Sequence, residues 1–310
     1  MARAYIGTSG WVYAGWREHL YADTPVKNWL RVASTTFDAL EINGSFYTQI
    51  KPETYQRWYD ETPDDFRFAL KGHRFVTHFK RLKGCDESIV RLRDQVHPLR
   101  EKLAAVVWQL PAHFEVNVPR LEEFCQSLEA WPGVGHALEL RHASWFTDEV
   151  AAILRAHEVA VCMGDAPDFP MWREVTSPMV YARLHGHTRK YASSYSEASL
   201  RAWAESTRQW LAEGRDVHVY FDNDAEGHAV RNAMRLAELV DGRARPAPPA
   251  HRYSGPAPCG SSRGEPWRRP TARPRSPSSS AHRSTARTGC RARPRRGRAR
   301  ARDRGGTDHR

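Results

Sequence analysis

Eight short apolar runs alternate with polar segments along the first 221 residues, and this alternation constrains the fold more than any other feature of the sequence. Each run is four to seven residues long and is rich in Val, Ile, Leu, Phe, Ala and Tyr, as is typical of strands buried on both faces of a parallel sheet. The eight runs are 4–7, 37–42, 66–70, 104–110, 136–140, 159–163, 179–184 and 217–221.

Segments with helical features lie between most of these runs. Apolar residues recur at helical spacing in 87–99 and in 120–128, and a proline suits the first turn of the helix expected at 53–59. Two further helices are expected to begin near Thr147 and Ser196, and a last one to span 225–240.

Eight strands that alternate with helices predict a parallel sheet, and the number eight favours its closure into a single (β/α)8 barrel, a TIM barrel. An open doubly wound sheet is the alternative. No G-x-G-x-x-G follows the first run, which weakens that alternative for a dinucleotide-binding protein.

The net charge of +11 divides unevenly along the chain. Residues 243–310 hold 19 arginines, no lysine and three acidic residues, so residues 1–242 are net acidic. The same segment holds ten of the 20 prolines and very few large apolar residues, so it cannot bury enough apolar surface to offset its chain entropy. We therefore predict a TIM-barrel domain over 1–242 and a disordered, basic tail over 243–310. Out-of-frame reading of a GC-rich gene would give a similar tail.

No run approaches the ~20 apolar residues that a membrane span requires, and no charged-then-apolar leader precedes the first run. We therefore expect a cytoplasmic protein without a membrane partner.

The carboxyl ends of the runs carry polar and aromatic residues. In a TIM barrel the chemistry lies on the loops that leave these ends. The residues expected to contact a substrate there are Ser9, Trp11, Tyr13, Asn43, Phe46, Tyr47, Lys71, Arg141, Arg183, Asn223 and Asp224.

Seven stretches resemble, in this order, the recurring motifs of the YecE-like family, domain of unknown function 72 (DUF72): IGTSGWVYAGW, ALEINGSFY, FRFALKGHRFVTHFKRL, QLPAHF, LELRHASW, ARLHGHTRKYASSYS and VYFDNDAEGHAVRNA. The resemblance covers about 5–240 and implies a TIM barrel whose activity is not established. Asp222 departs from the family pattern, which more often has asparagine there, and it adds a negative charge at the barrel mouth.

Two glutamates occupy matching places near the ends of the second and fifth runs. Glu41 is followed two residues later by Asn43, and Glu139 by Arg141. Side chains two apart on a strand share a face, so each pair points the same way. Two interpretations remain open. The glutamates form an acid/base pair in which one raises the pKa of the other, or they form ion pairs with Arg141, Arg183 or Lys71 that brace the rim.

Arg183 and His185 share a face of the seventh run. They suit a clamp for phosphate or carboxylate, with Arg183 pairing with Asp222 or Glu139 as the alternative. Lys71 ends the third run. A desolvated lysine there could form a Schiff base, but an ammonium in an ordinary ion pair is the preferred interpretation.

The expected catalytic set is Glu41, Glu139, His185 and Asp222. These four residues also have the ligand types of a divalent-metal site, but no short ligand motif such as H-E-x-x-H occurs. We therefore predict no cofactor, with a divalent metal on these four residues as a lesser alternative.

Together these patterns favour an enzyme of hydrolase or lyase type that acts on a small polar substrate, with phosphate-bearing compounds as the class that suits the arginine and histidine cluster. The expected partner is thus a small-molecule or anionic ligand. One alternative is a nucleic-acid-binding or phosphodiester-processing barrel, in which the same mouth meets the phosphodiester backbone and the arginine-rich tail adds non-specific affinity. Another is a non-catalytic ligand-binding protein. Because residues 1–242 are net acidic, we expect nucleic acid to bind only through the basic tail.

Overall fold

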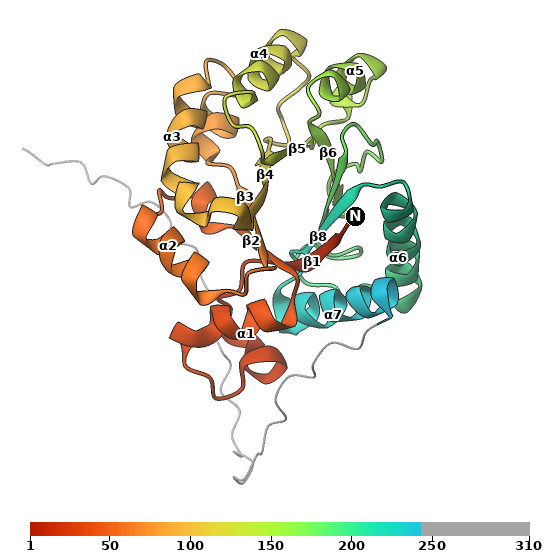
Figure 1. Cartoon of the computed structure of the whole chain (residues 1–310). Coiled ribbons are helices and arrows are strands. Elements are labelled where there is room, and N and C mark those ends of the chain that lie inside the picture. The colour runs from red at the N-terminus through yellow and green to blue at the C-terminus, as the bar shows by residue number, and fades with distance from the viewer. Residues whose placement is uncertain (243–310) are drawn as a thin grey trace, which may run out of the picture. The chain divides into compact units, whose positions relative to one another are not determined.

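Eight parallel strands close into one barrel in sequence order, with β1 pairing to both β2 and β8 (Figure 1). The computed structural model describes residues 1–242, so the predicted disorder of 243–310 lies outside the described residues. The strands are β1 (Ala4–Ser9), β2 (Ala39–Ile42), β3 (Arg67–Lys71), β4 (Leu103–Gln109), β5 (Gly135–Glu139), β6 (Ala160–Asp165), β7 (Met179–Leu184) and β8 (Asp216–Phe221). All eight predicted strands are confirmed, and the closed barrel excludes the open doubly wound sheet.

Seven α-helices of residues 1–242 surround the barrel (Figure 1). They are α1 (Trp29–Thr36), α2 (Pro52–Glu61), α3 (Asp86–Val96), α4 (Val118–Leu128), α5 (Asp148–Ala156), α6 (Glu197–Ala212) and α7 (His228–Asp241). Side chains cap three of them where a helix start was expected or close to it, with Asn117, Thr147 and Ser196 accepting main-chain N–H bonds. The sequence patterns did not indicate α1, and the segment between β6 and β7 contains no helix.

One cluster of inward-facing side chains fills the interior of the barrel, and these side chains are small on one side and large on the other. The cluster consists of Tyr5, Ala39, Ala69, Ala105, Val107, Ala137, Ala160, Cys162, Met179, Tyr181 and Tyr220. Alanines line one side, and tyrosines from β1, β7 and β8 fill the space opposite. The imidazole of His218 stacks on Tyr5 with ring centroids 4.6 Å apart, and its Nδ1 lies 3.0 Å from the Tyr220 hydroxyl.

Two residues further along most of these strands, the interior becomes polar. Glu41 follows Ala39, Lys71 follows Ala69, and Arg183 follows Tyr181. Because side chains two apart on a strand share a face, these residues form the next inward layer toward the carboxyl ends of the strands. Ser9, Gln109 and Glu139 occupy the corresponding places on β1, β4 and β5, and all six side chains are buried.

Gly7 allows β1 and β2 to approach closely beside this layer. A Cβ atom at this position would lie 1.7 Å from the carbonyl oxygen of Ala39 on β2. Any side chain would therefore force the two strands apart, so the requirement for glycine here is steric.

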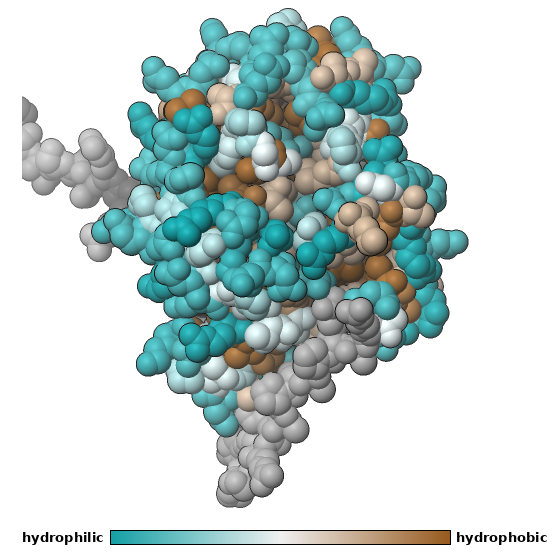
Figure 2. Space-filling view, viewed as in Figure 1, coloured by the Kyte–Doolittle hydropathy of each residue, from teal (hydrophilic) through white to brown (hydrophobic). Residues whose placement is uncertain are grey.

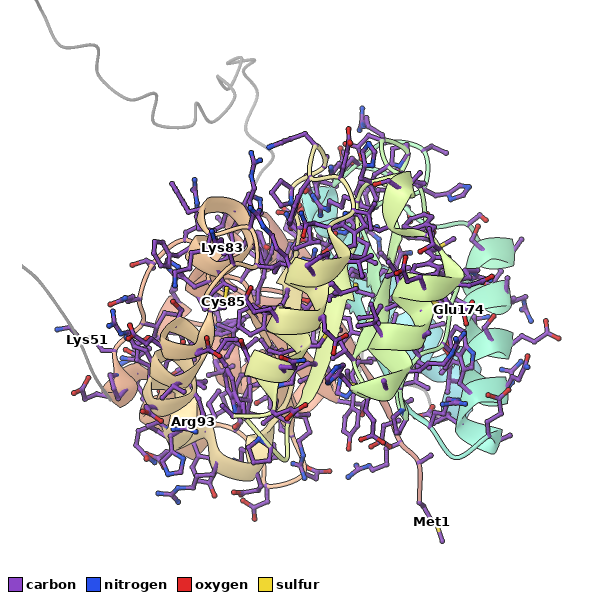
Figure 3. The ribbon with its side chains drawn as sticks, turned by 90° about the horizontal axis from the view of Figure 1, so that it is seen from above. Met1, Lys51, Lys83, Cys85, Arg93 and Glu174 are labelled. Atoms are coloured by element: carbon purple, nitrogen blue, oxygen red, sulfur yellow. The ribbon has the colours of Figure 1, made fainter. Side chains whose placement is uncertain are left out.

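Met1, before β1, and Lys83, in the loop after β3, lie at opposite ends of the molecule, and α3 runs between these ends from near Cys85 past Arg93 (Figure 3). The face seen along the barrel in Figure 2 is hydrophilic over much of its described area, with apolar residues in small separate groups. No helix within residues 1–242 is long and apolar enough to cross a bilayer.

Candidate functional site at the barrel mouth

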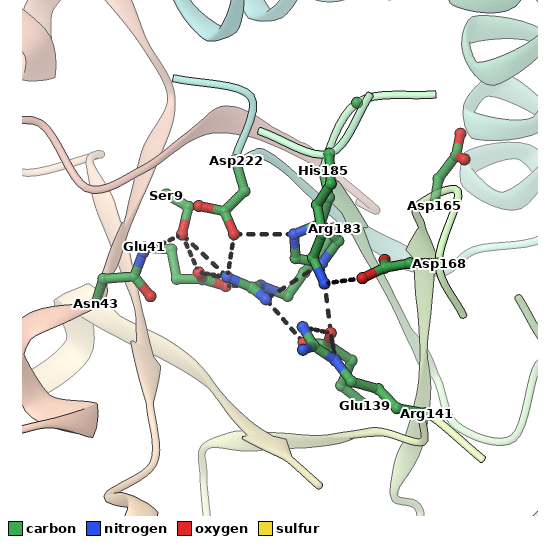
Figure 4. A network of polar contacts seen from close by, with 12 residues as sticks. Ser9, Glu41, Asn43, Glu139, Arg141, Asp165, Asp168, Arg183, His185 and Asp222 are labelled. Carbon is green, nitrogen blue, oxygen red and sulfur yellow. Dashed lines mark hydrogen bonds and ion pairs between the residues drawn. The ribbon is translucent and has the colours of Figure 1, made fainter. Parts of the chain in front are cut away.

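The guanidinium of Arg183 is the centre of the polar layer and has no exposed surface (Figure 4). Its Nε lies 3.0 Å from Glu41 Oε2, and its Nη1 donates to Glu139 Oε2 at 2.8 Å. Its Nη2 donates to Glu41 Oε1 at 2.8 Å and to Asp222 Oδ2 at 3.1 Å. Arg183, on β7, thus bridges one carboxylate on β2, one on β5 and one directly after β8.

Glu41 is held from several sides. Its Oε2 accepts a hydrogen bond from the Tyr181 hydroxyl at 2.7 Å, and its Oε1 accepts one from the Ser9 hydroxyl. Asn43 in turn donates to Ser9 Oγ at 2.7 Å. Of the two interpretations of Glu41 and Glu139, the observed contacts are those of the ion-paired arrangement.

Glu139 and Asp222 are anions in this environment. Burial by itself would raise the pKa of Glu139, but the guanidiniums of Arg141 and Arg183 outweigh burial and hold it well below its usual range. Burial would likewise raise the pKa of Asp222, yet Arg183 and a hydrogen bond with His185 lower it to about 2. Neither carboxyl carries a proton near neutral pH, so neither suits the role of general acid.

His185 lies against the same network and is fully buried. Its Nδ1 is 2.9 Å from Asp222 Oδ2, and its Nε2 is 3.4 Å from Glu139 Oε1. The rings of Phe169 and Tyr191 meet the imidazole edge to face, with centroids 5.6 and 5.8 Å away. The predicted catalytic set therefore gathers in one place around Arg183, which was itself expected to bind substrate.

Lys71 differs from the other charged groups of the layer. Its side chain is 6% exposed, and its Nζ lies over the ring of Phe46, 4.3 Å from the centroid. Within residues 1–242 the ammonium has no carboxylate within 4.0 Å and no hydrogen-bond acceptor. Burial, with a contribution from Arg183, lowers the pKa of Lys71 to about 8. The preferred interpretation of Lys71 as an ion-paired ammonium is therefore wrong for the described residues.

Asp224 and Asn223 follow β8 but have different surroundings. Burial, and then the negative charge of Asp222, raise the pKa of Asp224 to about 6. Asn223 is fully buried, and its Nδ2 donates to the carbonyl of Ser193 and to Asn232 Oδ1, both at 2.9 Å. Asn223 thus joins the loop after β7 to α7, while Asp224 is the carboxyl of this segment that can exchange a proton near neutral pH.

The predicted aromatic residues separate into two groups. Trp11 packs into the hydrophobic core, where its ring meets Trp58 edge to face with centroids 5.0 Å apart. Tyr13 donates to the carbonyl of Ser9 at 2.8 Å, and Phe46 lies beneath Lys71. Tyr47 is exposed and meets Phe46 edge to face. Trp11 is therefore a core residue, Tyr13 and Phe46 border the polar layer, and Tyr47 lies outside Phe46.

Phe169 is a mouth residue that the sequence patterns did not indicate. It lies between the guanidinium of Arg141, 4.6 Å from the ring centroid, and the ammonium of Lys190, 5.1 Å from it. A Cβ atom at Gly164 would lie 2.8 Å from the same ring, so the glycine allows this loop to fold over β6. The segment between β6 and β7 has no periodic pattern, and its sequence gives no signal that would have placed Phe169 here.

The part of the chain that the structure describes contains no group of three or more His, Cys, Asp and Glu side chains arranged to hold a metal ion. The guanidinium of Arg183 lies between Glu41, Glu139 and Asp222, where it supplies the positive charge that these carboxylates require.

Comparison with known proteins places this barrel in a family. The model of the family described as "Protein of unknown function DUF72" matches residues 5–253. The chain belongs to the DUF72 family. The match agrees with the resemblance seen in the seven sequence motifs.

Relatives of this chain include UPF0759 proteins of two bacteria. The UPF0759 protein YunF of Bacillus subtilis (strain 168) is 24% identical over 271 residues, which cover 76% of this chain and 94% of YunF. The UPF0759 protein YecE of Escherichia coli (strain K12) is 31% identical over 144 residues, which cover 46% of this chain and 50% of YecE.

Crystal structures of DUF72 proteins share the fold. The DUF72 protein of Thermotoga maritima has a TM-score of 0.69 and 27% identity, over 77% of this chain and 99% of that one. A DUF72 protein of Enterococcus faecalis has a TM-score of 0.66 and 19% identity, over 77% of this chain and 95% of that one.

Proposed function

We propose that this DUF72 protein is a cytoplasmic enzyme of hydrolase or lyase type that acts on a small, anionic, polar substrate at the mouth of its barrel. The observation that carries the proposal is Lys71, a buried ammonium without an anionic partner among residues 1–242. A buried cation is costly unless it is paired, so most buried charges have partners. A phosphate or carboxylate group of a substrate would supply the missing partner.

The neighbours of Lys71 support an anion at this place. Arg141 is near the surface of the network, with its side chain 10% exposed, and it already contacts Glu139 through Nε at 2.7 Å. Its remaining guanidinium donors can bind a second anion, because a guanidinium carries five N–H groups. Lys190 lies at the rim beyond Phe169 and is a third cation, already paired with Asp168 Oδ2 at 2.7 Å.

A pair of carboxyls with separated pKa values supports proton transfer at the same end of the barrel. Asp222 has its pKa lowered to about 2, whereas Asp224 has its pKa raised to about 6. Pairs of this kind are typical of active sites in which one carboxylate stays ionised and the other donates and accepts protons. We therefore assign general acid/base catalysis to Asp224, and assign to Glu41, Glu139 and Asp222 the orientation of Arg183 and His185.

Calorimetric titration of the wild-type protein with a panel of sugar phosphates and small carboxylic acids tests the proposal. At least one member of the panel should bind, and Lys71→Met should weaken its binding roughly tenfold or more, which corresponds to about 1.4 kcal/mol. Lys27→Met removes an exposed lysine and should leave the affinity unchanged. Equal affinities for wild type and Lys71→Met would contradict the proposal.

One observation favours nucleic-acid binding as a second candidate function. The loop after β3, residues 73–83, carries four lysines and arginines and no acidic residue. Within it Phe75 is 46% exposed and Phe79 is 66% exposed, and Arg74 and Lys80 lie over these rings. Exposed aromatic rings among cations suit the stacking of single-stranded bases. Binding of labelled single-stranded RNA that weakens with salt and is lost in Phe79→Ala would favour this candidate.

A further inference from the structure

Two buried lysines of this protein differ in their hydrogen bonding. Lys102 is 2% exposed, and its Nζ donates to the carbonyls of Tyr59 and Thr62 at 2.8 and 2.7 Å. Lys71 is nearly as buried, but among the described residues its Nζ contacts only the face of Phe46. Lys102 is thus held in place by two main-chain carbonyls and lies 4.3 Å from the centroid of the Tyr59 ring. Lys71 Nζ has a matching cation–π contact with Phe46 but no hydrogen-bond acceptor among residues 1–242 to fix its position.

We propose that Lys71 is a nucleophile that forms an imine with the carbonyl carbon of a small aldehyde or ketone that also carries an anionic group. This inference rests on the proposed function, since it requires the substrate to bind at the barrel mouth. It goes beyond that function by naming the reacting atom and the substrate class. It also selects the lyase alternative over the hydrolase, because a protonated imine withdraws electrons from the neighbouring carbon–carbon bond.

The proposed step balances without another reactant besides a solvent proton. The lone pair of the neutral Lys71 amine attacks the carbonyl carbon, the carbon–oxygen π bond breaks, and a proton moves from nitrogen to oxygen to give a carbinolamine. The nitrogen lone pair then forms the carbon–nitrogen double bond as the carbon–oxygen single bond breaks. The hydroxyl takes a proton from solvent and leaves as water, so the imine keeps its N–H and is protonated. The product is a carbon–nitrogen double bond, and no atom is oxidised or reduced overall.

The charges around Lys71 suit both the neutral amine that attacks the carbonyl and the protonated imine that forms. Arg183 faces Lys71 as a second cation and opposes its protonation, which favours the nucleophilic amine. The negative charges of Glu139, Asp222 and Glu41 favour a positive charge on the Lys71 nitrogen, so they would also stabilise a protonated imine. His78, from the loop after β3, also faces Lys71, and burial together with Arg74 lowers its pKa to about 4, so it adds no charge near neutral pH.

The pKa of about 8 makes the reaction possible near neutral pH. At pH 8 about half of the Lys71 side chains are neutral, whereas an ordinary lysine with a pKa near 10.4 is neutral in less than about 1% of molecules. Imine formation should therefore be selective for Lys71, and its rate should rise with pH to a plateau above about pH 8.

Reduction with sodium borohydride tests the inference, because it converts an imine into a stable secondary amine. The full-length protein is incubated at pH 7.5 with pyruvate, glyceraldehyde 3-phosphate or dihydroxyacetone phosphate and then reduced. The expected result is a single adduct on the intact protein for at least one probe, mapped by peptide mass spectrometry to Lys71. Lys102 should be unmodified in the same sample, and Lys71→Met should lose the adduct.

Thermal unfolding of Lys71→Met and of Lys71→Arg shows whether each variant is folded, and Lys71→Arg keeps the positive charge while removing the nucleophile. Loss of the adduct in a folded Lys71→Arg protein that still binds the probe supports the inference. Absence of any adduct on Lys71 in a wild-type protein that binds the same probe overturns the inference and leaves the proposed function intact. Modification spread over surface lysines, with Lys71 unmodified, also overturns it.

Discussion

At the scale of single residues, the ion-paired arrangement of Glu41, Glu139 and Arg183 decides what this site can do. The sequence predicted that these residues share one end of the barrel. Each lies near the carboxyl end of its strand, at a position whose side chain points into the barrel. It could not decide between an acid/base pair and an ion-paired rim, since that depends on which side chains meet across the barrel. The bridging position of Arg183 between β2, β5 and β8 is a property of the closed barrel alone.

Replacing Arg183 should destabilise the protein strongly. Arg183→Met leaves Glu41, Glu139 and Asp222 as buried carboxylates without their shared cation, which should lower the free energy of unfolding by about 3–5 kcal/mol. Urea unfolding measures the loss. Arg201→Met is the matched control, because Arg201 is 63% exposed in its pair with Glu197 and such pairs contribute about 1 kcal/mol or less. Equal effects of the two substitutions would contradict the account of the network.

Replacing Lys71 should have the opposite effect on stability. An apolar methionine of similar length removes a buried ammonium that has no partner within residues 1–242, so Lys71→Met should unfold at an equal or higher urea concentration than wild type. A stabilised variant that has lost ligand binding is the expected signature of a functional residue. A clear loss of stability would show that Lys71 has a structural partner.

The stability of the protein should depend on Asp222 in acid. The pKa of Asp222 is lowered from 3.8 to about 2 in the folded protein, so the unfolded chain binds its proton first as pH falls. The stabilisation from Asp222 is complete above about pH 4 and is lost as pH falls toward 2. Asp222→Asn should therefore show a shallower fall in the free energy of unfolding between pH 5 and pH 2 than wild type. Parallel curves would contradict the assigned pKa.

At the scale of secondary structure elements, the strands and six of the helices within residues 1–242 were predictable, whereas α1 and the loop from β6 to β7 were not. Short runs of Val, Ile, Leu, Phe and Ala indicated each strand because both of its faces are buried. The helix α1 was missed although Trp29, Leu30 and Ala33 pack into the core at helical spacing. The loop from β6 to β7 has no periodicity, so the position of Phe169 over the mouth depends on contacts distant in sequence.

The pairing of β1 with β2 should depend on the absence of a side chain at Gly7. Gly7→Ala places a methyl group 1.7 Å from the carbonyl oxygen of Ala39, so the strands must separate or the protein must unfold. We expect a loss of several kcal/mol in urea unfolding, on the order of the largest single-substitution effects, about 4–5 kcal/mol. Gly15→Ala is the control, because a methyl group there has nothing within 4 Å. A near-neutral Gly7→Ala would contradict the described register.

At the scale of the whole molecule, the charge is distributed unevenly between two segments of the chain. Residues 1–242 form the barrel and are net acidic, whereas residues 243–310 carry the excess of arginine. The amino-acid composition is sufficient to predict this division. The fold, the strand order and the end of the barrel that carries charge were likewise predictable, because they follow from strand count and polarity.

A chain that ends at Gly242 should retain the unfolding temperature of the full chain, because the strands and helices of the barrel all lie within it. It should also lose any salt-dependent binding to DNA or RNA that the full chain shows, since the barrel domain is net acidic. Electrophoretic mobility at two salt concentrations measures the second effect. Retained binding would instead favour the basic and aromatic loop of residues 73–83.

The central claim is that the ligand binds at the mouth of the barrel, and a crystal structure with a bound ligand tests it most directly. Crystals would be soaked with the tightest-binding member of the titrated panel. We predict that its anionic group lies within hydrogen-bond distance of Lys71 Nζ or the Arg141 guanidinium. A ligand found only in the cavity of about 270 Å³ beside α3, which is lined by Tyr55, His73 and Arg91, would contradict the claim.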